Sequence, residues 1–270
     1  MIHLKNILEF KIKKMWVVKM IKIPNKKNYD FCNLNISSSA NAELFFYGEI
    51  VSSSWDAWQM EDQYPENVKS LIDDIGDRDI DIHINSPGGN VFAGCAIYNL
   101  LKNAKGTKTV YIDGVAASIS SIIAMAGDEI IIPENAYLMI HKPMLSISNA
   151  NANELRQEAD LLDKFEAGIL NTYMTKTLPE ITEAVLAEKL EAETWLSGQE
   201  ASEIFTNITV SAANQAAAKI DVEMFRNYKN IPQKIKNKTE KKELEKPDMT
   251  EFKNFENLLN IKYTKNEEEI

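Results

Sequence analysis

Only three histidines, His3, His83 and His141, occur in this chain of 270 residues, so each can be weighed as a catalytic group. His3 lies in a lysine-rich stretch. His83 lies on the polar side of an alternating segment, where an ordinary surface role is expected. His141 ends the apolar run "AYLMIH", and a residue at the end of a buried strand is held rigidly beside an opening. His141 is therefore the candidate for acid–base chemistry.

Serine is abundant, but Ser118 has distinctive surroundings. Ala116 and Ala117 precede it, and such small residues allow a sharp turn from the strand "TVYI" into a helix. That turn would put Ser118 at a helix N-terminus, where free N–H groups favour the negative charge that develops in acyl transfer. The alternative is that Ser118 only caps the helix. Ser120 and Ser121 are rival nucleophiles, although both would lie inside the helix.

The segment "INSPGGNVFAG" places Gly88 and Gly89 between a predicted strand and a predicted helix. A glycine pair in this position can bind phosphate, hold an oxyanion or simply turn the chain. A phosphate loop would need Gly-Lys-Ser/Thr after the turn, and neither that motif nor G-x-G-x-x-G is present. The phosphate interpretation therefore loses its support.

Hydrophobic periodicity predicts the elements that must position these residues. In "DIDIHIN" the isoleucines alternate with polar residues, which predicts a strand with one buried face. Further strands are expected at 44–50, at 107–114 ending in Gly114, and as two short strands within 128–141. Helices are expected at 65–75, 91–104, 116–127, 152–176, 179–192 and 196–205. Strands alternating with helices predict an α/β domain with crossover connections.

Composition excludes several classes of protein. The net charge is −10, and residues 32–228 alone carry about −17, which argues against a nucleic-acid-binding core. No apolar run reaches the roughly 18 residues needed to span a bilayer, so no membrane partner is expected. Cys32 and Cys95 form no CxxC pair, which disfavours a disulfide framework or zinc site. We expect a reducing, cytoplasmic setting and neither metal nor cofactor.

Three motifs in this order, "INSPGG", "GVAASIS" and "LMIHKP", resemble the ClpP family of serine peptidases, and the resemblance covers about residues 42–210. It implies an α/β fold of the ClpP/crotonase-like type, with repeated ββα units and a protruding long handle helix. It makes Ser118 the nucleophile and His141 the general base. It also implies an oxyanion hole made by Ile119 and by a backbone N–H at Gly88 or Gly89.

The resemblance also suggests the third member of a catalytic triad. The family has an aspartate shortly before an L-S-x-x-E-A segment, and alignment on "LSGQEA" puts Glu193 at that position. A carboxylate there would accept the His141 Nδ1–H and steady the imidazolium. Glu191 is a rival. Asp160 and Asp163 are weaker candidates, on the expected long helix.

Several segments look most like the ClpP-like head maturation (prohead) proteases of tailed phages and prophages. Among them are "YGEI", "NAYLMIHKP" and "AETWLS". This likeness implies a phage scaffold or capsid protein as substrate, in the host cytoplasm or within a procapsid. It also implies a homo-oligomer, as a heptameric ring or stacked rings. The usual N-terminal segments that meet an unfoldase ATPase are not recognisable, which disfavours that partner.

The chain is expected to divide into a basic, poorly ordered extension with its linker (1–40), a protease domain (41–215) and a charged, largely disordered tail (216–270). The tail composition suits a scaffold-contacting or self-cleaved extension. Three alternatives to a ClpP-type peptidase remain. They are a crotonase-type acyl-CoA enzyme, which needs no Ser–His pair, a Ser–Lys protease using Lys142, and an inactive assembly protein on the same fold.

Overall fold

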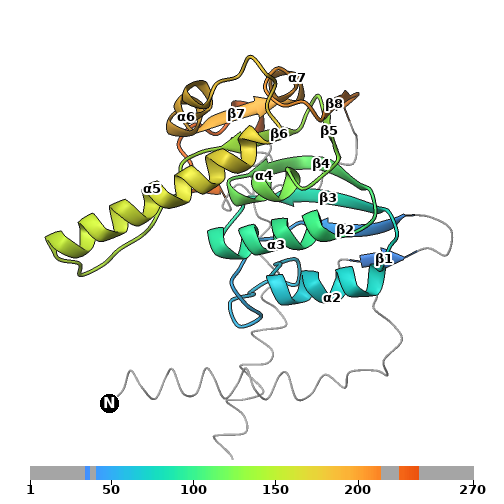
Figure 1. Cartoon of the computed structure of the whole chain (residues 1–270), viewed down its shortest axis with the longest axis horizontal. Helices are drawn as coiled ribbons and strands as arrows, with labels where there is room; N and C mark the ends of the chain where they lie inside the picture. The colour runs from blue at the N-terminus through green and yellow to red at the C-terminus, as the bar shows by residue number, and fades with distance from the viewer. Residues whose placement is uncertain (1–33, 37–40, 214–224, 237–270) are drawn as a thin grey trace, which may run out of the picture.

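The computed structural model describes residues 34–36, 41–213 and 225–236, and its centre is an eight-stranded sheet (Figure 1). The main strand order is β1-β2-β3-β4-β5-β8, while β6 pairs with β4 and β7 pairs with β6. Neighbours are parallel except β1 with β2 and β6 with β7. This mixed α/β architecture confirms the expected fold class. The strands are β1 (Leu34–Ile36), β2 (Ala42–Phe46), β3 (Ile80–Ser86), β4 (Lys108–Ala117), β5 (Glu129–Pro133), β6 (Tyr137–Ile140), β7 (Thr194–Ser197) and β8 (Ile208–Ser211).

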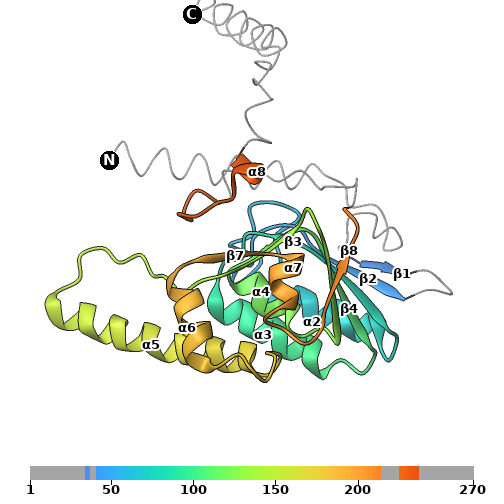
Figure 2. The same ribbon diagram turned by 90° about the horizontal axis from the view of Figure 1, so that it is seen from above.

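Helices connect the strands and cover one face of the sheet, where α2, α3 and α4 lie side by side in both views (Figures 1 and 2). The helix α5 runs well beyond the edge of the sheet. Its 23 residues confirm the predicted long helix, whereas its use as a handle between rings stays a prediction. The helices are α2 (Pro65–Ile75), α3 (Val91–Asn103), α4 (Ile119–Ala124), α5 (Ala152–Met174), α6 (Glu183–Glu191), α7 (Gly198–Ser202) and α8 (Gln233–Lys236).

The two faces of the central strands differ as the alternating sequence predicts. Ile80, Ile82 and Ile84 are fully buried in the main core under the helices. The opposite face carries a row of rings across β2, β3 and β4, in which His83 stacks between Phe45 and Tyr111 with ring centroids 4.9 Å apart. The Asp113 carboxylate accepts a hydrogen bond of 2.9 Å from His83 Nδ1, so this histidine has a partner. His83 pairs with Tyr111 in the sheet and is therefore several residues away from the end of β4, where Ser118 lies.

Some element boundaries differ from those that the sequence predicted. Strand β4 does not end at Gly114 but continues to Ala117, because its last three residues pair with β6. Helix α6 begins at Glu183 rather than near Pro179, since the Thr182 side chain caps it by accepting from Val185 N. The expected helix over 196–205 is wrong at its start, because Leu196 and Ser197 pair with β6 as part of β7 and α7 covers only Gly198–Ser202. The three-residue strand β1 was not predicted, and neither were β7 and β8. None of these three strands is longer than four residues, which is too few for a clear alternating pattern.

The expected domain boundaries fall largely where the structure gives no description. Most of the extension 1–40 and the segments 214–224 and 237–270 lie outside the described residues, so the three-part division stays a prediction. Residues 225–236, within the expected tail, are described and contact the body through Phe225 and Tyr228. Within the described ranges, no helix is long and apolar enough to cross a membrane.

Candidate active site

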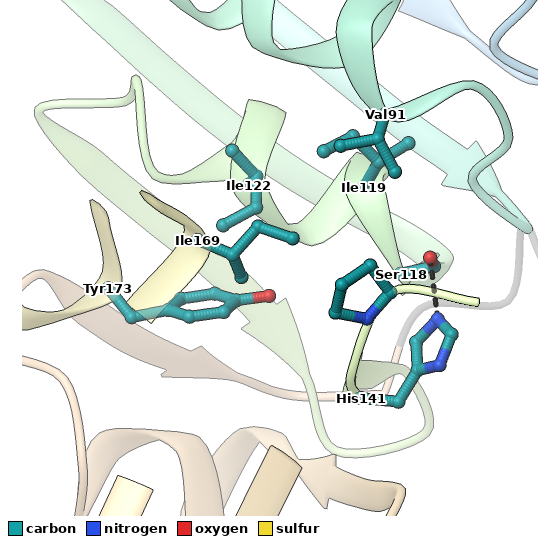
Figure 3. A pocket seen from close by; sticks show the side chains of 8 residues that line it. Val91, Ser118, Ile119, Ile122, His141, Ile169 and Tyr173 are labelled. Atoms are coloured by element: carbon teal, nitrogen blue, oxygen red, sulfur yellow. Dashed lines mark hydrogen bonds between the residues drawn. The ribbon is translucent and has the colours of Figure 1, made fainter. Parts of the chain in front are cut away.

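Strand pairing brings Ser118 and His141 together. Strands β4 and β6 are parallel with Ala117 opposite Met139, so the residues that follow each strand emerge at the same edge of the sheet. The Ser118 N–H donates to the Met139 carbonyl at 3.0 Å, which continues the ladder by one residue. The Ser118 Oγ lies 2.7 Å from His141 Nε2, although 23 residues separate them in the chain. The dashed line in Figure 3 marks this hydrogen bond.

The backbone of Ser118 has an uncommon conformation, with φ 55° and ψ −129°. A positive φ in a residue other than glycine is strained and persists where the surroundings enforce it, which is frequent at active sites. Ser118 occupies the N-cap position of α4, but its side chain makes no capping hydrogen bond. The hydroxyl faces His141 instead, so helix capping does not account for this serine.

The two rival serines are engaged in the protein interior. Ser120 and Ser121 are fully buried, and each hydroxyl donates to a backbone carbonyl of the preceding turn. Ser121 also shares a hydrogen bond of 2.6 Å with the buried Tyr173 hydroxyl. Neither hydroxyl is paired with a histidine in these contacts.

Glu193 comes to the site through the antiparallel pairing of β6 and β7. Thr194 lies opposite Ile140, so the next pair outward along these strands is His141 with Glu193. Glu193 is only 9% exposed and has φ 49°, a left-handed backbone that is uncommon for glutamate. Its Oε1 accepts hydrogen bonds of 2.7 Å from the N–H groups of Lys229 and Asn230. The described hydrogen bonds to this carboxylate do not include one from His141.

The other candidate carboxylates lie elsewhere. Glu191 forms an ion pair with Lys142, whose ammonium also reaches Glu166 at 3.3 Å. Asp160 and Asp163 are exposed on α5. Of these four carboxylates, Glu193 is therefore the one that is buried beside the carboxyl end of β6, where His141 lies.

Two opposing influences set the pKa of His141. Burial disfavours the imidazolium and lowers the pKa below its ordinary value of 6.5, while the negative charge of Glu193 raises it in part. The net effect is a lower pKa. A lower pKa keeps the imidazole neutral near pH 7, and only the neutral form can take a proton from the Ser118 hydroxyl.

The glycine turn lies directly against the serine. A Cβ on Gly88 would come within 2.6 Å of the Ala117 carbonyl oxygen, 2.8 Å of Ser118 Cβ and 3.2 Å of Ile119 N. Both Gly88 (φ 95°) and Gly89 (φ 144°) have backbone conformations that side chains oppose. The Gly88 N–H donates to Ser86 Oγ over a rather long 3.1 Å, and the Gly89 N–H has no acceptor among the described hydrogen bonds. The choice between the two glycines as oxyanion donor stays open.

Two depressions open beside the Ser118 hydroxyl. Apolar side chains of α3, α4 and α5 line a narrow pocket next to it (Figure 3), and they are Val91, Ile119, Ile122, Ile169 and Tyr173. A wider polar groove of about 420 Å³ passes along the glycine turn and the segment 143–146. A polypeptide lying in the wider groove would pass within reach of Ser118.

Sequence reasoning missed one residue at this site, Tyr228. It lies in a Lys- and Asn-rich stretch whose composition predicts a disordered tail. Its hydroxyl donates to the Pro87 carbonyl at 2.6 Å, and its ring meets the His141 ring edge-on with centroids 5.3 Å apart. The only local signal was an aromatic pair, Phe225 and Tyr228, in otherwise polar sequence.

Comparison with known proteins supplies independent information about this chain. A family model described as Clp protease matches residues 48–204. The "ATP-dependent Clp protease proteolytic subunit" of Chaetosphaeridium globosum is 31% identical over 163 residues, which are 59% of this chain and 77% of the relative. The "Chloroplastic ATP-dependent Clp protease proteolytic subunit 1" of Arabidopsis thaliana is 32% identical over 161 residues, which are 58% of this chain and 78% of the relative.

Proposed function

Because this chain belongs to the Clp protease family of ClpP-type serine peptidases, we propose that it is a serine endopeptidase with Ser118 as nucleophile and His141 as general base. The observation that carries the proposal is the 2.7 Å hydrogen bond between Ser118 Oγ and His141 Nε2. The Gly88–Gly89 turn, whose backbone N–H groups could bind an oxyanion, lies directly beside this pair. A serine needs such a base because its hydroxyl is a weak nucleophile at neutral pH.

The proposed reaction proceeds through an acyl-enzyme. His141 takes the Ser118 proton as Oγ attacks the peptide carbonyl, and the N–H of Ile119 with that of Gly88 or Gly89 holds the oxyanion. His141 then gives the proton to the leaving amine, and a water molecule, activated in the same way, releases the acyl group. Glu193 stabilises the imidazolium through its charge.

A fluorophosphonate probe tests this proposal, since the serine oxygen displaces fluoride at phosphorus only when it is activated. We expect covalent labelling of the wild type, none of Ser118→Ala and weak labelling of His141→Ala. Ser202→Ala, on α7, serves as the matched serine control and should be labelled like the wild type. Failure of the wild type to label in any assembled state would contradict the proposal and favour an inactive assembly protein.

Neither of the other enzyme classes is as well supported. A crotonase-type enzyme needs a backbone oxyanion site but no serine–histidine pair. The hydrogen bond between Ser118 and His141 would have no role in its reaction. A Ser–Lys protease would need a neutral lysine at the serine. The Lys142 ammonium is paired with Glu191 and Glu166 instead.

For the biological role, we propose processing of scaffold or capsid protein during phage head maturation, supported by the sequence segments "YGEI", "NAYLMIHKP" and "AETWLS". The second candidate is a cellular protease with an ATPase partner, which is favoured by the names of the relatives, both ATP-dependent Clp protease subunits. Either role fits a cytoplasmic homo-oligomer, since ClpP family members form rings. We propose a heptameric ring here, with α5 as the contact between stacked rings.

Co-expression separates the two roles. Cleavage of a head structural protein encoded beside this chain, without added ATP, would support the maturation role. Degradation of a folded model substrate only with an unfoldase and ATP would support the cellular role. The Ser118→Ala variant is the control in both arms, because it abolishes peptidase activity whichever partner is present.

A further inference from the structure

The segment Phe225–Asn230 lies against the catalytic residues although it follows the region that the family model matches, which ends at residue 204. Phe225 is 1% exposed and anchors the segment in a small apolar cluster behind the end of β4 and β6, formed with Val115, Ala117 and Met139. Figure 2 shows this part of the chain, leading into α8, on the side of the sheet opposite α2 and α3. The next residues along the segment reach Glu193 and His141.

Its first contact with the site is at Glu193. The backbone N–H groups of Lys229 and Asn230 both donate to Glu193 Oε1 at 2.7 Å, and the Asn230 side-chain amide donates to the Ala192 carbonyl at 2.9 Å. A carboxylate on a residue that is only 9% exposed needs such donors, because burying a charge without hydrogen bonds is strongly unfavourable. The donors that hold this carboxylate therefore come from 36 and 37 residues farther along the chain.

The second contact is made by Tyr228. Its ring packs edge-on against His141 at 5.3 Å with an interplanar angle of 73°, and it shields the imidazole from solvent on that side. Its hydroxyl donates to the carbonyl of Pro87, the residue immediately before Gly88. Burial raises the pKa of Tyr228 to about 12, so the hydroxyl stays protonated and able to donate. One side chain thus connects the general base with the glycine turn.

We propose that Phe225–Asn230 is a positioning element of the active site, which holds Glu193 through two backbone N–H groups and fixes His141 and the glycine turn through Tyr228. The inference rests on the proposed function, since it assigns a role within the same catalytic site. Catalytic geometry tolerates displacements of only about 0.5 Å. Loss of the segment's contacts should therefore slow acylation of Ser118 even where the fold survives.

Two changes in the full-length protein test the proposal. Lys229→Pro removes one N–H that holds Glu193, and Gln233→Pro is its matched control, because proline is tolerated at the first, exposed residue of helix α8. Tyr228→Phe removes only the hydroxyl that holds the Pro87 carbonyl. The readouts are the rate of Ser118 labelling by a fluorophosphonate and its dependence on pH, with thermal denaturation to verify folding.

We expect Lys229→Pro to slow labelling by about 10- to 100-fold. The acid side of its pH profile should move to lower pH, because the Glu193 charge that raises the pKa of His141 is no longer held in place. Tyr228→Phe should slow labelling by several-fold with an unchanged pH profile, whereas Gln233→Pro should match the wild type. A purely structural role would lower the melting temperature without moving the pH profile.

The outcomes separate this inference from the function on which it rests. No labelling of the wild type would overturn the proposed peptidase itself. Wild-type rates and pH profiles in both variants would overturn the positioning role and leave the peptidase standing. Faster labelling in the variants would also overturn it, by making the segment an inhibitory cover. If Lys229→Pro does not fold, Tyr228→Phe decides alone, because it keeps the packed ring. Slower labelling at a wild-type melting temperature then supports the positioning role, and a wild-type labelling rate overturns it.

Discussion

The Ser118 hydroxyl and the His141 imidazole lie 2.7 Å apart because β4 and β6 run parallel with Ala117 opposite Met139. The antiparallel pairing of β6 with β7 brings Glu193 beside His141, since Ile140 lies opposite Thr194. The candidate triad is thus formed by residues that follow or precede three adjacent strands. Rigid strands are better supports for such a site than loops, because their ladders fix position to a fraction of an ångström.

The first prediction concerns pH. Burial lowers the pKa of His141, and the base is active only when neutral, so the rate should rise with pH through that lowered pKa. The midpoint of the acid limb of kcat/KM should therefore lie below 6.5, the ordinary value for histidine. Hydrolysis of a small peptide substrate, measured from pH 4 to 8, gives the midpoint directly. A midpoint above 6.5 would contradict the burial seen here.

Removal of the Glu193 charge should have two effects at once. Glu193→Gln should lower kcat by about 10²-fold or more, because the imidazolium loses its stabilising carboxylate. It should also shift the acid limb to lower pH, since that charge raises the pKa of His141. Glu191→Gln is the matched control and should change neither quantity, because Glu191 pairs with Lys142. Equal effects of the two substitutions would refute the assignment of Glu193.

A methyl group on the glycine turn should damage the oxyanion site. Gly88→Ala puts a Cβ within 2.6 Å of the Ala117 carbonyl at φ 95°, so the turn must move away from Ser118. We expect kcat/KM to fall by about 10²-fold or more. Gly168→Ala is the control, because no atom lies within 4 Å of its added Cβ and alanine favours a helix. Unchanged kcat/KM in Gly88→Ala would argue against the turn as part of the site.

Lys142 offers a test against the Ser–Lys alternative. Its hydrogen bond to Glu191 raises the pKa of the ammonium, which keeps it charged and unable to act as a base. Lys142→Met should therefore retain fluorophosphonate labelling of Ser118 within about threefold, and stability should change by less than about 1 kcal/mol, as is usual for an exposed ion pair. Labelling reduced as far as in His141→Ala would instead implicate the lysine.

Periodicity predicted most elements because burial repeats along them. The isoleucines of β3 and the apolar stripe of α2 each face the core, and both elements have the predicted extent to within one residue. The end of β4 was misjudged at Gly114. Nothing local to residues 115–117 reveals that β6, more than twenty residues away, will pair with them.

The sequence by itself determined the fold class, the family motifs and the identity of Ser118 and His141 as candidates. It could do so because hydrophobic periodicity, motif spacing and residue type are local properties of the chain. Only the tertiary structure decided which hydroxyl meets the imidazole, which carboxylate lies at the end of β6, and that Tyr228 belongs to the site. Glu193 is held by backbone N–H groups of Lys229 and Asn230, and a backbone group carries no sequence signature. Contacts of that kind exist only once distant segments have packed together.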